Sequence, residues 1–181
     1  MLLDRLKESP KNKFLIPITI LGLIVVLLVY ILIFIPIEAS VSTYGILDYE
    51  FAWTQSRMEN ILSVWGVDGI KKQTLAIYWD FLYIVGYVSL ALGLIIIVLR
   101  RSEGKIQIIG LYFTLTPFLT GIFDIIENIN LLIMLSDSIS TFNPFIASLS
   151  ALIKFSFLFA AIAYFIVALT IVIIKKLKQR E

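Results

Sequence analysis

Four apolar stretches dominate the sequence, and each reaches the length of about 20 residues that a helix needs to cross the hydrocarbon core of a bilayer. Hydrophobic residues make up 60% of the 181 and charged residues only 15%, so too few polar side chains remain to cover the outside of a soluble domain. We therefore predict an all-α integral membrane protein, a four-transmembrane-helix bundle that forms one domain over 1–181. The predicted spans are about 14–37, 74–99, 106–135 and 144–174.

Lysine and arginine are concentrated in three segments, which are the N-terminal arm, the turn 100–105 and the tail after Ile174. All three lie on the same side of a four-span chain, and cationic loops are retained on the cytoplasmic side of a membrane. The connection 38–73 instead carries five acids against three bases, and the turn 136–143 carries no base. The sequence thus predicts a multi-pass protein of the cell membrane with cytoplasmic N- and C-termini.

The connection between the first two spans contains a segment, about 45–66, in which apolar residues recur at the spacings of three and four that are typical of a helix. Ser56 to Glu59 has the pattern of a capping box that begins a helix, and Gly66 is a typical helix stop. We expect an extracytoplasmic amphipathic helix that lies on, or caps, the outer end of the bundle. Its apolar positions are Leu47, Phe51, Met58, Ile61, Leu62 and Trp65.

Ionisable side chains inside the spans are the most informative residues, because each costs about 2.5 to 3.5 kcal/mol at the bilayer centre. They are Asp80, Asp124, Glu127 and Lys154. On the third span the two acids share one helix face with Thr120 and Asn128, so this face is expected to point into the bundle. A rise of about 1.5 Å per residue places Asp124 and Lys154 at a similar depth, roughly 15 Å from the outer edge. We therefore expect these two side chains to meet.

These side chains predict a polar cluster in the outer half of the membrane. Tyr83 and Tyr87 share the helix face of Asp80, so their hydroxyl groups can reach the cluster. With three carboxylates and one ammonium the cluster would carry an excess of two negative charges, which protonation, a bound cation or water must compensate. The predicted ligand-binding residues are Asp80, Tyr83, Tyr87, Thr120, Asp124, Glu127, Asn128 and Lys154.

A purely structural role for this cluster is an equally good interpretation, because a buried polar network can simply determine which helices pack together. Pro117, midway along the third span, removes one backbone hydrogen bond and is expected to kink the helix. Thr114, Thr116 and Thr120 are placed to satisfy the carbonyl that this proline leaves free.

Two segments, Trp79–Tyr87 and Gly121–Asn128, resemble a group of small four-span bacterial membrane proteins. In that group an Asp-aromatic-Leu segment in the second span is followed by an Asp-x-x-Glu-Asn segment in the third. The similarity extends back over 47–69. It implies a four-span fold and treats Asp80, Asp124, Glu127 and Asn128 as one constellation, and it implies no substrate.

Composition also limits the chemistry. The chain has no Cys and no His, which excludes a thiol nucleophile, an imidazole base and the usual zinc ligands, so we predict neither metal nor cofactor. A nearly balanced count of 15 basic and 13 acidic residues gives no reason to expect a nucleic-acid partner.

The favoured functional prediction is an accessory membrane protein that binds a lipid, a small ligand or a cation, with another membrane protein or a second copy of the chain as its partner. The first alternative is an enzyme that acts on a lipid or isoprenoid, with Asp124 or Glu127 as general acid or base. The second is a proton or cation transport protein, because buried carboxylates can carry protons or bind cations.

Overall fold

The computed structural model describes residues 2–41, 43–136 and 139–179, and within these residues the chain is helical and has no strand. Four helical segments are long and apolar enough to cross a membrane, and they contain the four predicted spans. These segments are Asn12–Glu38, Gln55–Arg101, Gly104–Leu135 and Phe142–Lys178. The elements are α1 (Leu2–Glu8), α2 (Asn12–Val29), the π-helix η1 (Tyr30–Phe34), α3 (Ile35–Glu38), α4 (Ile46–Glu50), α5 (Gln55–Arg101), α6 (Gly104–Phe113), α7 (Thr116–Leu135) and α8 (Phe142–Lys178).

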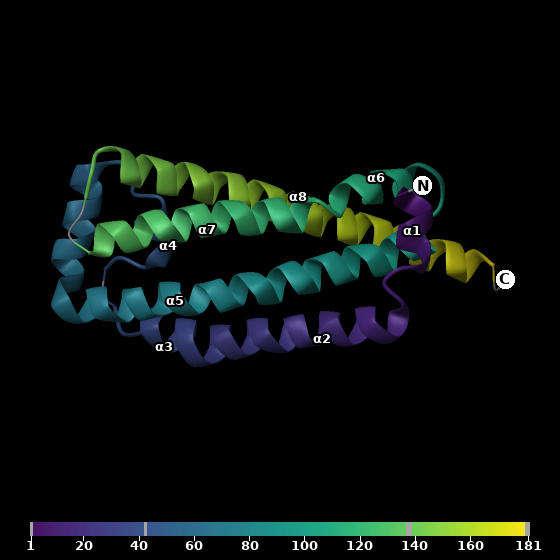
Figure 1. The fold of residues 1–181 in the computed structure, drawn as a ribbon, viewed down its shortest axis with the longest axis horizontal. Coiled ribbons are helices and arrows are strands. Elements are labelled where there is room, and N and C mark those ends of the chain that lie inside the picture. Colours follow the sequence, from purple (N-terminus) through teal and green to yellow (C-terminus); the bar gives the residue numbers. More distant parts are fainter. Residues whose placement is uncertain (1, 42, 137–138, 180–181) are drawn as a thin grey trace.

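The long helices lie side by side (Figure 1). α2 packs against α5, α5 packs against α7 and α8, and α7 packs against α8. Helix α1, the turn between α5 and α6, and the C-terminal part of α8 lie at one end of the bundle, whereas the connection between α7 and α8 lies at the other, which we call the distal end. Arg180 of the predicted cationic tail, and positions 137 and 138 of the base-free turn, lie outside the described residues.

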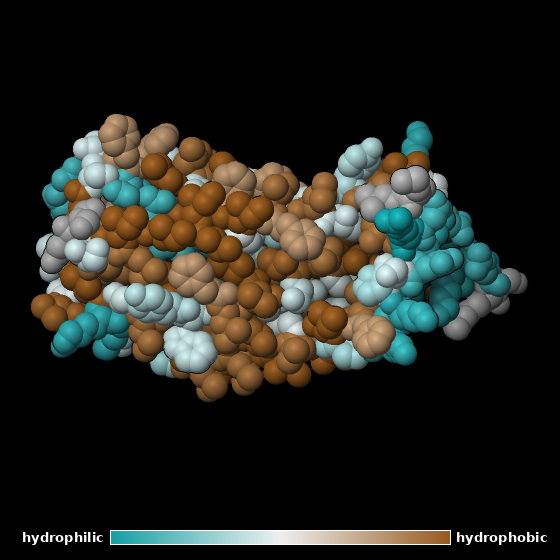
Figure 2. Space-filling view, viewed as in Figure 1, coloured by the Kyte–Doolittle hydropathy of each residue, from teal (hydrophilic) through white to brown (hydrophobic). Residues whose placement is uncertain are grey.

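Apolar side chains cover the long sides of the bundle. On the face shown in Figure 2 they form a continuous brown surface, and hydrophilic residues gather most strongly at the end that holds both termini. Leu32 on η1 and Phe159 on α8 are 63% and 64% exposed. An apolar surface of this extent is typical of a molecule whose sides face an apolar medium.

The segment 45–66 differs from the single amphipathic helix that was predicted. It forms two helices, because the chain leaves α4 after Glu50, passes Trp53 with a positive φ of 59°, and begins α5 at Gln55. Thr54 is the N-cap of α5, and its Oγ1 accepts a hydrogen bond from Arg57 N at 3.3 Å. The predicted capping box at 56–59 is therefore wrong: the cap lies two residues earlier.

Gly66 interrupts α5 as expected for a helix stop. Its φ of 59° and ψ of −172° break the helical path, and α5 then continues from 67 to 101. The first part of α5, 55–65, lies across the distal ends of α7 and α8 (Figure 1). Its side chains Met58 and Ile61 are fully buried there, in one core cluster with Leu131 and Ala147. This part of the chain closes the distal end of the bundle.

The third apolar segment is broken as well as bent. Helix α6 ends at Phe113, and Pro117 occupies the first turn of α7. Pro117 has no N–H to donate to Phe113 O, and the hydroxyl of Thr116 donates to that carbonyl instead, at 2.8 Å. The predicted kink and the predicted threonine compensation are both observed.

Helices α2 and α5 approach closely where two glycines, Gly22 and Gly86, face each other. A Cβ at Gly22 would lie 2.6 Å from Gly86 O and 2.8 Å from Leu90 N. Both are backbone atoms, so a side chain at Gly22 could be accommodated only if α2 moved away from α5. Small residues at such a contact let two helices pack backbone to backbone.

We expect Gly22→Val to destabilise the protein by about 1–3 kcal/mol through overpacking. The measurement is the Tm of the detergent-solubilised protein, which should fall by about 2–4 °C for each kcal/mol. Leu21→Val is the matched control, because Leu21 is 59% exposed on the same helix and its truncation should leave Tm nearly unchanged. Equal Tm values for the two variants would contradict the close approach of α2 and α5.

Candidate functional site

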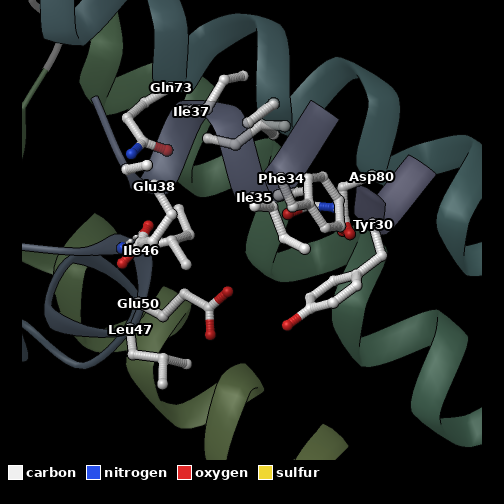
Figure 3. Close-up of a pocket in the computed structure, with 14 residues that line it drawn as sticks. Tyr30, Phe34, Ile35, Ile37, Glu38, Ile46, Leu47, Glu50, Gln73 and Asp80 are labelled. Carbon is white, nitrogen blue, oxygen red and sulfur yellow. Dashed lines mark hydrogen bonds between the residues drawn. The ribbon is translucent and has the colours of Figure 1, made fainter. Parts of the chain in front are cut away.

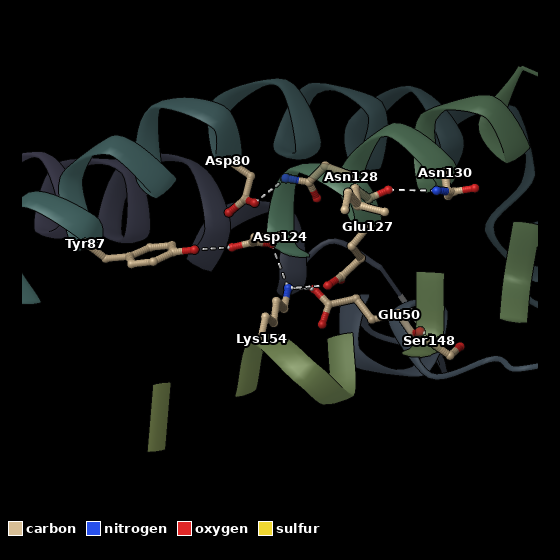
Figure 4. Close-up of polar contacts among 10 residues, drawn as sticks. Glu50, Asp80, Tyr87, Asp124, Glu127, Asn128, Asn130, Ser148 and Lys154 are labelled. Atoms are coloured by element: carbon tan, nitrogen blue, oxygen red, sulfur yellow. Dashed lines mark hydrogen bonds and ion pairs between the residues drawn. The ribbon is translucent and has the colours of Figure 1, made fainter. Parts of the chain in front are cut away.

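Lys154, on α8, lies among three carboxylates inside the bundle (Figure 4). Its Nζ is 2.9 Å from Asp124 Oδ1 and 2.8 Å from Glu127 Oε2, both on α7, and 3.5 Å from Glu50 Oε1 at the end of α4. The Lys154 side chain is 9% exposed and that of Glu127 is completely buried. The expected meeting of Asp124 and Lys154 is therefore confirmed, and it joins α4, α7 and α8.

The sequence explains why these groups can come so close. The acids of α7 are three residues apart, so they project from one face toward α8. On α8 the lysine is preceded at helical spacing by Ala147 and Ala151, which have no exposed surface. These small side chains let α7 and α8 approach until the ammonium reaches both carboxylates.

Two further hydrogen bonds extend the cluster to α5. The hydroxyl of Tyr87 donates to Asp124 Oδ2 at 2.8 Å, and the side-chain amide of Asn128 donates to Asp80 Oδ2 at 2.5 Å. Each oxygen of Asp124 therefore has its own partner, one from α5 and one from α8. Asp80 lies at the edge of the cluster, connected to α7 through Asn128 (Figure 4).

Two of the predicted site residues lie outside this hydrogen-bonded network. Thr120 is buried, but its hydroxyl donates to Thr116 O on its own helix at 3.0 Å. Tyr83 packs its ring against Phe34 of η1, with 5.2 Å between ring centroids, and against Tyr87, at 5.8 Å. Its role in the structure is aromatic packing between the first and second apolar segments.

Glu50 is the functional candidate that the sequence analysis did not identify. It was counted with the acids of an outer loop, whereas the structure inserts α4 among the distal ends of α5, α7 and α8, where Glu50 is only 8% exposed. The hydroxyl of Tyr49 donates to Leu131 O at 3.0 Å, and that of Ser148 donates to Glu50 O at 2.7 Å and accepts from Trp53 N at 2.9 Å. The available signal was a single charge inside the apolar run Tyr49–Trp53.

The cluster holds more acid than its one base can neutralise. Glu50, Asp80, Asp124 and Glu127 give four carboxyl groups against Lys154, an excess of three negative charges if all are ionised. Burial raises the pKa of Glu50 and the nearby Asp124 raises it further, although Lys154 opposes the shift. Among the described residues no group of acids is arranged to hold a metal ion.

A cavity of about 480 Å³ adjoins the cluster. It lies between the first apolar segment, α4, α5 and α7, and Figure 3 shows the Glu50 carboxylate projecting into it. Its surface is mostly apolar, and it opens between η1–α3 and α4, since Tyr30, Ile35 and Leu47 line it and are yet about half exposed. The lining residues are Tyr30, Phe34, Ile35, Ile37, Glu38, Ala39, Ile46, Leu47, Glu50, Gln73, Ala76, Ile77, Asp80 and Asn128.

Two polar atoms in this lining are buried without a hydrogen bond to any described residue. They are Oε2 of Glu50 and Nε2 of Gln73, whose residue is 1% exposed. A buried polar atom left unpaired costs about 1–3 kcal/mol, so native proteins seldom keep one without a partner. These two lining residues therefore keep hydrogen-bonding capacity that no described residue uses.

We expect Lys154→Leu to destabilise the protein by about 3–5 kcal/mol, because removing one member of a buried ion pair leaves uncompensated charge. Adding Asp124→Leu should restore part of the loss. Thermal unfolding of the purified protein in mild detergent is the measurement. Lys175→Leu is the matched control, because Lys175 pairs with Glu103 at 3.2 Å on the exposed surface and such pairs contribute little. Additive effects of the two cluster substitutions would show that Lys154 and Asp124 are not coupled.

Comparisons with known protein families, with curated proteins and with solved structures find no significant match to this chain. The resemblance to the four-span bacterial group therefore stays a prediction.

Proposed function

We propose that the chain is a multi-pass protein of the cell membrane with cytoplasmic termini, and that it binds a small amphiphilic molecule, such as a lipid, in the cavity near its distal end. In this proposal the distal end faces the outside of the cell. The protein acts as a binding or accessory protein of the membrane and performs no chemistry on the bound molecule.

The membrane assignment is supported by the four apolar segments and by the distribution of charge along the bundle. The predicted cationic segments that are described, at the N-terminus, at 100–105 and after Ile174, all lie at the end that holds the termini. Cationic segments are retained in the cytoplasm. The base-poor connection 38–73 contains α4 and 55–65, which belong to the distal end.

The observation that carries the binding function is the cavity with its unpartnered polar atoms. Its volume of about 480 Å³ falls in the range of about 300–1,000 Å³ that is typical of small-molecule sites, and an apolar lining with a few convergent polar groups is the usual composition of such sites. The exposed residues of the lining include the apolar side chains of Tyr30, Ile35 and Leu47 as well as Glu38. This mixed rim favours a ligand with both an apolar and a polar part.

The same geometry favours binding over catalysis by the predicted residues. Asp124 and Glu127, the candidate acid and base, both pair with Lys154 and do not line the cavity. A general acid or base must come within hydrogen-bond reach of the reacting group. Transport of a cation past Asp124 and Glu127 is also disfavoured, because the ammonium of Lys154 occupies the position between these two carboxylates.

The orientation can be tested with single cysteines, because the natural chain has none. We expect Glu59→Cys, at the distal end, to react with a membrane-impermeant maleimide in intact cells. Ser9→Cys and Glu103→Cys should react only after lysis, since Ser9 directly follows α1 and Glu103 lies in the turn between α5 and α6, and both elements belong to the end with the termini. Labelling of all three positions in intact cells, or the reverse pattern, would contradict the proposed topology.

Binding can be tested with dodecanol as a neutral amphiphile and with the full-length protein in phosphatidylcholine nanodiscs. Dodecanol at 100 times its Kd should stabilise the protein by about 2.7 kcal/mol, measured as a rise in Tm. Ala76→Phe should weaken this binding at least about tenfold, because Ala76 is buried in the cavity wall and a phenyl ring occupies ligand space.

Val85→Phe is the matched control, since Val85 is on the same helix and 62% exposed, and it should bind dodecanol as the natural chain does. Absence of any amphiphile binding to the natural chain would overturn the proposed function.

A further inference from the structure

We propose that the amphiphile bound in the cavity carries a protonated amine as its head group, that Glu50 and Asp80 hold this ammonium, and that its chain extends outward between η1–α3 and α4. This inference rests on the proposed function and adds the chemical class of the ligand.

The charged side chains that line the cavity are all acidic. The lining includes the carboxyl groups of Glu38, Glu50 and Asp80 and contains no lysine or arginine. Lys154 does not line the cavity, and its Nζ forms ion pairs within 3 Å of both Asp124 and Glu127. A phosphate or carboxylate head group would therefore meet acids and find no cation, whereas an ammonium would find oxygen acceptors.

Unpartnered oxygens indicate independently where the ammonium would bind. Glu50 uses Oε1 toward Lys154 at 3.5 Å, while Oε2 is buried with no hydrogen-bond partner among the described residues. Asp80 uses Oδ2 to accept from Asn128, and Oδ1 makes no hydrogen bond to a described residue. Figure 3 shows the Glu50 carboxylate facing the open interior of the cavity. An ammonium group offers several N–H donors, which is what two carboxylate oxygens require.

Charge balance gives a reason for such a ligand to bind tightly. The four carboxyl groups of the cluster face one ammonium, so a second ammonium lowers the excess of buried negative charge without any change in the protein. Water would compete poorly for these acceptors, because most of the cavity surface is aliphatic and aromatic. Phe34, Ile35, Ile46 and Leu47 line it on the side of the opening.

The shape of the cavity favours an alkyl chain behind the amine. Glu50 is buried and Asp80 is partly buried, whereas Tyr30 and Leu47 at the opening are 49% and 57% exposed. The ligand is therefore held by its head group, and its chain can continue along the apolar side of the bundle. An alkyl chain longer than the cavity is compatible with this arrangement. The chemistry of the head group therefore determines the affinity more than the length of the alkyl chain does.

The test compares three amphiphiles with the same chain length, dodecylamine, dodecanol and dodecanoate, on the full-length protein in phosphatidylcholine nanodiscs near neutral pH. Binding is measured by the shift in Tm as a function of ligand concentration and by native mass spectrometry. We expect the amine to bind at least about tenfold more tightly than the alcohol, since charge-assisted hydrogen bonds are roughly twice as strong as neutral ones. Dodecanoate should bind more weakly than both.

Glu50→Gln and Asp80→Asn should each remove most of the preference for the amine and keep the binding of dodecanol, which also shows that the variants are folded. Glu59→Gln is the matched control, because it removes one negative charge from an exposed position of α5 and should keep the preference.

The outcomes separate the two proposals. If dodecylamine and dodecanol bind equally to the natural chain, the amine inference is wrong and the amphiphile site stands. If neither binds, the proposed function itself fails. If both cluster variants keep the full preference for the amine, the head group is held elsewhere and the inference is overturned.

Discussion

The fold of the distal half depends on one ammonium group inside an apolar bundle. An isolated lysine would be expensive there, and Lys154 is stable only because Asp124, Glu127 and Glu50 approach it from α7 and α4. The reverse also holds, since these carboxylates have no other base within reach among the described residues. The ion pairs therefore force α4, α7 and α8 to meet at one depth, and this requirement accounts for the insertion of a short helix among the ends of longer ones.

The two sides of Glu50 connect this network to the cavity. Its backbone carbonyl accepts from Ser148 and one carboxylate oxygen faces Lys154, whereas the other oxygen has no hydrogen-bond partner among the described residues. The α7–α8 side of the site holds the shortest ion pairs of Lys154, although Glu127 Oε1 is also buried there without a hydrogen bond to a described residue. The π-helix η1 forms part of the η1–α3 side of the cavity. It is followed by Pro36, which supplies no backbone N–H. Tyr30 and Phe34, at the two ends of η1, both line the cavity.

Hydropathy and depth were enough to predict part of this arrangement. Runs of about 20 apolar residues identified the four long helices, and counting the helical rise brought Asp124 and Lys154 together, because a regular helix converts sequence position directly into depth. Glu50 could not be placed in this way. It belongs to a connection whose path is determined by tertiary hydrogen bonds, such as that of Tyr49 with Leu131, and no local periodicity reports a bond between residues 82 apart. The division of 45–66 into two helices could not be predicted for a related reason. The helical spacing of apolar residues continues across the break, although the helical conformation of the backbone does not.

The cavity and the charged cluster share Glu50, Asp80 and Asn128, but only the cavity is lined by η1 and α3 and only the cluster includes α8, and this arrangement has a chemical consequence. α2, η1 and α3 pack along α5 through the glycine contact at Gly22, away from the α7–α8 interface that holds Lys154. The opening of the cavity lies on the side of η1–α3, so a ligand can occupy it while the ion pairs of Lys154 with Asp124 and Glu127 remain in place. The protein therefore supplies a fixed negative wall on one side and an apolar wall on the other. A wall of fixed charge that does not reorganise on binding discriminates among head groups by sign, and this is the property that a selective binding site for cationic amphiphiles requires.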